Sequence, residues 1–97
     1  MTTEEINNFV ESMTFEDSTV RLFNKTYWCL GLSWNEEKKK HYISVMEADP
    51  NTYEGLCDLF FYESESRDDC MKHFLEDKYW DGKSFYEVAN DMEWIDL

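Results

Sequence analysis

The chain has 97 residues, which predicts one domain over residues 1–97. Aromatic residues make up 18% of it, enough to supply a packed core and to exclude a disordered chain. With 22 acidic and 9 basic residues the formal net charge is −13, so the chain repels nucleic acids and anionic lipids and attracts basic surfaces. We therefore expect no direct nucleic-acid partner and no membrane partner.

The acidic excess is uneven along the chain. Residues 1–47 hold eight acidic and five basic residues, whereas residues 48–97 hold fourteen and four. Such charge destabilises the fold through self-repulsion. Two explanations stay open: a basic partner relieves the repulsion, or the charge only keeps the protein soluble.

The beginning of the chain and its cysteines predict a cytoplasmic location. Residues 1–5 are acidic at positions 4 and 5 and contain no apolar run, so they do not form a signal peptide. No stretch is long and apolar enough for a membrane span. The cysteines are odd in number and widely spaced, which is typical of buried thiols in a reducing compartment: Cys29, Cys57 and Cys70.

The first predicted element is a helix that begins after Thr2. Thr2 can cap it, and Glu5 stands three residues later, at the spacing of a capping box. Its apolar residues recur at helical spacing: Ile6, Phe9, Val10 and Met13.

Strands are predicted next. The clearest signal is an apolar row at period two, formed by Trp28, Leu30, Leu32 and Trp34, with Tyr27, Cys29, Gly31 and Ser33 on the opposite side. Shorter alternations surround Val20 and Leu22, and His41, Ile43 and Val45. A turn at 49–51 precedes a strand at about 56–62. The pattern predicts an antiparallel meander of three or four strands.

Two helices are predicted at the C-terminal end. Ser66 caps the first, with Asp69 three residues on, and Ser84 caps the second, with Glu87 three residues on. We expect the last helix to end near Met92 or Glu93, and the tail from residue 94 to be extended and to pack an aromatic ring on the core. The fold class is therefore α+β, with an N-terminal helix and two C-terminal helices packed on one sheet face.

No pattern in the chain predicts catalysis or a metal site. His41 and His73 lie on different predicted elements, and no metal-ligand spacing accompanies them. Cys70 and His73 share a helix, but Cys70 belongs to its apolar stripe, where a thiol is unreactive. We expect no catalytic residue, no metal and no cofactor, and we take the protein not to be an enzyme.

Carboxylates of the C-terminal half are the candidate partner-binding residues. A protein that mimics nucleic acid needs a dense array of outward-pointing carboxylates, because duplex DNA carries one negative charge per roughly 1.7 Å of helix axis. The candidates flank the last strand, the two helices and the turn between them: Glu63, Glu65, Asp68, Asp69, Glu76, Asp77, Asp81, Glu87 and Asp91.

Two resemblances bear on function. The segments Asp81-Gly82-Lys83-Ser84-Phe85 and Glu93-Trp94-Ile95-Asp96, with Cys70-Met71-Lys72-His73-Phe74-Leu75 before them, resemble the ending of small acidic proteins of bacterial mobile elements. The order of elements and the acidity also resemble small prophage anti-CRISPR inhibitors of an RNA-guided nuclease, and Phe85-Tyr86 and Asn90-Asp91-Met92 echo their last helix at a different spacing. That second resemblance implies an acidic protein that covers the arginines with which such a nuclease recognises DNA. No functional residue transfers from it.

The expectation is a small acidic protein that binds a basic, nucleic-acid-handling or defence protein and inhibits it. The alternative is a protein–protein interaction module whose acidity serves solubility, with exposed aromatics such as Tyr53 or Tyr86 as its contacts. An enzyme ranks third. We expect a monomer or a weak homodimer, the latter through an open strand edge.

Overall fold

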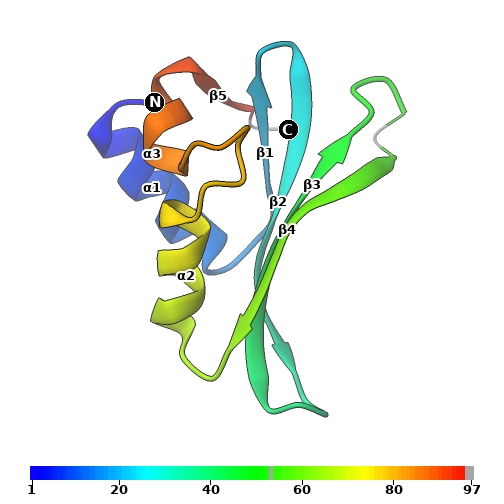
Figure 1. The fold of residues 1–97 in the computed structure, drawn as a ribbon, viewed down its shortest axis with the longest axis vertical. Helices are drawn as coiled ribbons and strands as arrows, with labels where there is room; N and C mark the ends of the chain where they lie inside the picture. Colours follow the sequence, from blue (N-terminus) through cyan, green and yellow to red (C-terminus); the bar gives the residue numbers. More distant parts are fainter. Residues whose placement is uncertain (53, 96–97) are drawn as a thin grey trace.

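A computed structural model describes residues 1–52 and 54–95, and Figure 1 shows a helical layer beside one twisted sheet. The elements in chain order are α1 (Thr3–Met13), β1 (Ser18–Leu22), β2 (Lys25–Asn35), β3 (Lys40–Ala48), β4 (Gly55–Ser64), α2 (Arg67–Glu76), α3 (Phe85–Val88), the 3-10 turn η1 (Ala89–Asp91) and β5 (Met92–Ile95). The α+β class is confirmed. No helix among the described residues is both long and apolar enough to cross a membrane.

The sheet has five antiparallel strands in the order β4-β3-β2-β1-β5, so the expectation of three or four strands was too low. Strands β1 to β4 form the predicted meander. The additional strand comes from the tail: Thr19 pairs with Ile95 and Leu22 pairs with Met92. This pairing covers the edge of β1, which would otherwise leave a row of unpaired backbone groups.

The last helix is much shorter than expected. We predicted that it continues to about Met92, but α3 spans only four residues and passes through η1 into β5. Asn90 and Asp91 are weak helix formers, so little holds the helix together at that point. Pairing with β1 satisfies the backbone of the following residues instead. The predicted extended tail is correct as far as residue 95, and Asp96 and Leu97 lie outside the described residues.

The three predicted helix starts are confirmed. The side chains of Thr2 and Ser84 each complete a capping box, with Glu5 and Glu87 respectively. The hydroxyl of Ser66 accepts a hydrogen bond from the backbone N–H of Asp69. These caps depend only on residues three positions apart, which explains why the sequence predicts them well.

All three helices lie on the same side of the sheet, as Figure 1 shows, and the core fills the space between. Three fully buried rings join the helices: Phe9 of α1 stacks on Phe85 with centroids 5.5 Å apart, and Phe85 lies 5.3 Å from Phe74 of α2. The strands bury smaller side chains against these rings: Val20, Cys29, Ile43 and Val45.

Gly31 lets the end of α1 lie close to β2. A Cβ atom at this position would stand 2.5 Å from the backbone oxygen of Glu16 and 2.9 Å from that of Met13. The N–H of Gly31 also donates a hydrogen bond to the carboxylate of Asp17, at 2.8 Å. The close approach fixes which face of β2 the helices cover.

Candidate binding surfaces

The side of the sheet opposite the helices is left open in the described chain (Figure 1). Successive side chains of a strand point to opposite faces. Ile43 and Val45 of β3 are buried under the helices, so Tyr42, Ser44 and Met46 lie on the opposite side. We call that side the open face.

The strand register shows which residues share the open face. Cross-strand partners form four rows across it: Glu93–Arg21–Thr26–Ala48–Gly55, then Ile95–Thr19–Trp28–Met46–Asp58, then Leu30–Ser44–Phe61, and then Ser33–Tyr42–Glu63. The middle rows are rich in apolar side chains, and carboxylates stand at the ends of three rows. The open face therefore combines an apolar centre with a rim of three carboxylates, two of which pair with Arg21 and Lys38.

The strongest strand pattern of the sequence lies partly on this open face. The core takes Tyr27 and Cys29, whereas Trp28 and Leu30 of the predicted apolar row are half-buried on the other side. An irregularity between Leu30 and Ser33 then returns Leu32 to the core. At Gly31 the backbone of the chain that ends α1 lies too close for a larger side chain.

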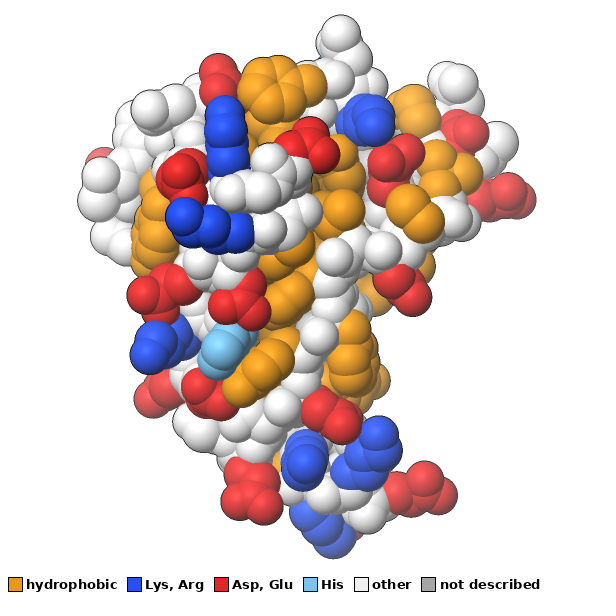
Figure 2. Space-filling model, viewed as in Figure 1, with side chains coloured by type: hydrophobic (Ala, Val, Ile, Leu, Met, Phe, Trp, Pro, Cys, Tyr) orange, Lys and Arg blue, Asp and Glu red, His pale blue; other side chains and the backbone are white. Residues whose placement is uncertain are grey.

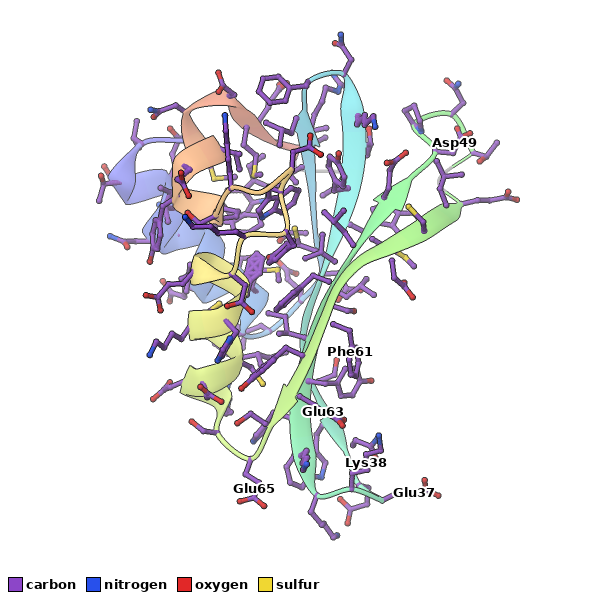
Figure 3. All side chains as sticks on the ribbon, in the orientation of Figure 1. Glu37, Lys38, Asp49, Phe61, Glu63 and Glu65 are labelled. Carbon is purple, nitrogen blue, oxygen red and sulfur yellow. The ribbon has the colours of Figure 1, made fainter. Side chains whose placement is uncertain are left out.

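A groove of about 360 Å³ lies where the open face meets the β2–β3 hairpin. It is lined by Trp34, Asn35, Glu36, Glu37, Lys38, Tyr42, Phe61 and Glu63. The rings of Tyr42 and Phe61 stack with centroids 5.9 Å apart. Figure 3 shows Phe61 and Glu63 on the side of β4 away from the helices, above Lys38 and Glu37, and Figure 2 shows the hollow on that side.

The groove keeps large apolar rings in contact with solvent. Phe61 is 59% exposed and Trp34 is 47% exposed. The Trp34 indole N–H donates to the Glu36 carboxylate at 2.6 Å, and Lys39 pairs with the same carboxylate. The Lys39 ammonium, followed by the indole, lowers the pKa of Glu36.

The nine predicted acidic residues are divided between the two sides of the sheet. Only Glu63 lies on the open face, opposite Tyr42. The other eight belong to the β4–α2 junction and to the helical side: Glu65, Asp68, Asp69, Glu76, Asp77, Asp81, Glu87 and Asp91. Figure 3 places Glu65 at the end of the sheet, beyond Glu63.

Three of these carboxylates are bound within the protein. Asp69 accepts a 2.8 Å hydrogen bond from the hydroxyl of Tyr62, and this bond is the main reason that its pKa is lowered. The carboxylate of Asp77 lies 2.9 Å from Nδ1 of His73. Glu87 accepts the backbone N–H of Ser84, which lowers the pKa of Glu87. Their first role is structural.

The helical side carries charges of both signs. Figure 2 shows acidic and basic side chains interspersed over this layer. Lys78 and Lys83 lie near enough to Glu87 to contribute to its lowered pKa. An interspersed surface is a poor copy of the uniformly negative DNA backbone.

The sequence analysis missed the acidic residues of α1 and the loop after it. Residues 1–20 hold five acidic residues and no basic one. Counting over residues 1–47 concealed this, because the five basic residues of that half all follow residue 20. A count element by element would have found it.

The cysteines only partly match expectation. Cys29 and Cys70 are buried, and burial raises the pKa of both thiols, so neither is a thiolate. Cys57 is exposed, which contradicts the prediction of three buried thiols. It lies on β4, one of the two edge strands, in the part where the side chains are exposed.

Of the two aromatics predicted as contacts, Tyr86 is 53% exposed on α3, and Tyr53 lies outside the described residues. Within residues 1–52 and 54–95, no three potential metal ligands converge. Compared with protein-family models, curated proteins and solved structures, the chain matches none of them. The functional argument therefore rests on the side chains of this chain.

Proposed function

We propose that this protein binds a basic surface of a nucleic-acid-handling partner in the cytoplasm and blocks it. The observation that supports this is the open face of the sheet, where apolar side chains are left uncovered and carboxylates stand at the rim. On a chain of net charge −13, such a face suits a partner that is positively charged and offers flat or apolar contacts.

Surfaces that bind nucleic acids are positively charged and offer flat or apolar contacts. They present arginine and lysine to phosphates, and many add aromatic or apolar side chains that contact bases. A protein that covers such a surface with carboxylates and aromatic rings competes directly with the nucleic acid. Inhibition then follows from occupancy and requires no chemistry.

The two parts of the open face have different roles in this proposal. The carboxylates, such as Glu63 and Asp58, attract the partner over a distance and make the association rate sensitive to salt. Rings such as Phe61 supply the buried contact that holds the complex together. The interaction should weaken in salt without disappearing.

A second candidate is an interaction module whose charge serves only solubility. The interspersed charges of the helical side and the internal roles of Asp69, Asp77 and Glu87 favour it. This candidate predicts weak salt dependence and a contact through Tyr86.

The test is capture of a partner on the immobilised protein at low and at high salt, followed by elution with duplex DNA. We expect to capture a basic protein. High salt should weaken its binding, and duplex DNA should displace it. Glu63→Lys should abolish capture, and Asp58→Lys, on the same face, should weaken it. Glu11→Lys on α1 makes the same charge change on the helical side and should leave capture intact.

Asp69 is unsuitable for this charge reversal because its carboxylate also holds Tyr62. Capture that survives both Glu63→Lys and high salt would refute the basic-partner proposal. If Tyr86→Ala then abolished capture, the interaction module would be favoured instead.

A further inference from the structure

We propose that the groove beside the β2–β3 hairpin receives an arginine side chain of the partner, with its guanidinium stacked on the Tyr42–Phe61 rings and paired with Glu63. This inference rests on the proposed function and names the group that the open face recognises. It follows from the shape of the groove, its aromatic wall and its charge.

The wall of the groove is aromatic and accessible. Tyr42 and Phe61 stack across β3 and β4. Trp34 of β2 also lines the groove, and its ring packs against His41, with centroids 4.7 Å apart. A cation over an aromatic face is attracted by the negative face of the ring. A volume of about 360 Å³ accommodates one long side chain.

The groove has an excess of negative charge. Three carboxylates line it, from Glu36, Glu37 and Glu63, against the single ammonium of Lys38. Glu36 is occupied by Trp34 and Lys39. Glu63 and Glu37 are therefore the carboxylates that an incoming cation would meet.

A cation of the protein itself already stands at this place. Nζ of Lys38 lies 3.4 Å from the Glu63 carboxylate, and the Lys38 side chain is 58% exposed. A long, exposed ion pair of this kind contributes little stability and exchanges readily. An arginine can replace it with two parallel hydrogen bonds to the same carboxylate.

Arginine fits this groove better than other cations. A quaternary ammonium is held by an enclosing aromatic cage, whereas a flat guanidinium stacks in an open groove and is weakly hydrated. A second copy of the chain is disfavoured because two molecules of net charge −13 repel each other.

The test uses three peptides of six residues, made of arginine, lysine or citrulline, titrated into the isotope-labelled protein at low salt. Citrulline keeps the size of arginine but carries no charge. We expect the arginine peptide to shift the indole N–H signal of Trp34 and the backbone signals of Phe61 and Glu63. The lysine peptide should bind more weakly, and the citrulline peptide should not bind.

Variants then localise the interaction. Phe61→Ala and Glu63→Gln should each weaken binding of the arginine peptide by about tenfold, the typical effect of losing one stacked or charge-paired contact. Phe15→Ala and Asp91→Asn remove an exposed ring and a carboxylate elsewhere and should change nothing. The unperturbed remainder of each spectrum shows that the variant is folded.

Three results would overturn the assignment: no binding of the arginine peptide, signals that move on α1 or α2 instead of the groove, or undiminished affinity in Phe61→Ala. None of them decides the proposed function, because partner capture and its loss in Glu63→Lys are measured separately. If capture failed while the peptide still bound in the groove, the proposed function would be wrong and the arginine site would stand.

Discussion

The rings of Phe9 and Trp94 meet edge to face, with centroids 5.2 Å apart and planes at 85°. This contact joins the first helix to the last strand. Trp94 also pairs with Val20 in the sheet, so one residue connects the helical layer to the edge of β1. The two ends of the chain therefore stabilise each other.

The first prediction concerns this pair of rings. Phe9→Ala should lower the free energy of unfolding by about 3–5 kcal/mol, since it empties a fully buried site. In a double-mutant cycle with Trp94→Ala, measured by urea denaturation, the coupling should be about 0.5–1.5 kcal/mol. Phe9→Leu serves the same cycle if Phe9→Ala does not fold. Strict additivity would mean that the ring contact contributes nothing.

The second prediction compares two glycines. Gly31→Ala should destabilise the protein by about 1–3 kcal/mol, because its Cβ meets backbone atoms of the α1–β1 connection that cannot move aside. In Gly55→Ala the added Cβ contacts only the flexible end of the Met46 side chain, at 3.0 Å, so the loss of stability should be much smaller. Thermal unfolding of both variants measures the difference, and equal losses would contradict the close packing under α1.

The third prediction concerns the pH dependence of Asp69. Hydrogen bonds from Tyr62 and Ser64, with the nearby charges of His73 and Lys72, lower the pKa of its carboxyl below the ordinary value of 3.8. Because the pKa is lowered in the folded state, ionised Asp69 stabilises the fold at pH values above the ordinary pKa of 3.8. This stabilisation is lost as the pH falls through the folded-state pKa.

An NMR titration of the Asp69 carboxyl carbon measures this directly. The midpoint should lie below 3.8 in the unmodified protein and rise in Tyr62→Phe, which removes the hydroxyl donor and keeps the ring. Asp69→Asn should be less stable than the unmodified protein near neutral pH, and the two should converge below pH 3.8. An unchanged midpoint in Tyr62→Phe would show that the hydroxyl does not set the pKa.

The fourth prediction concerns thiol reactivity. Cys57 is exposed, whereas Cys29 and Cys70 are buried with raised pKa values. A thiol reagent should therefore modify Cys57 rapidly in the native protein, and should modify the other two only after unfolding. Cys57→Ser should abolish the rapid phase. Rapid modification of Cys29 would contradict the burial of β2 under α1.

Parts of the fold that depend on neighbouring residues could be predicted well. The capping boxes at Thr2 and Ser84 and the alternation of Ile43 and Val45 are readable because helices and strands repeat over a few positions. The length of the last helix could not be predicted in this way. It ends after Val88 because the following residues pair with β1, some seventy positions earlier in the chain.

The sequence by itself determined that the protein is acidic, rich in aromatic rings and built from capped helices and alternating strands. Only the tertiary structure decided which side of β2 is buried, because the close approach of α1 at Gly31 selects Cys29 for the core and leaves Trp28 on the open face. It also decided that Tyr42, Phe61 and Glu63 share one groove, since strand register brings them together across β3 and β4. The net charge follows from composition, whereas the set of residues that share a surface depends on packing between residues distant in the chain.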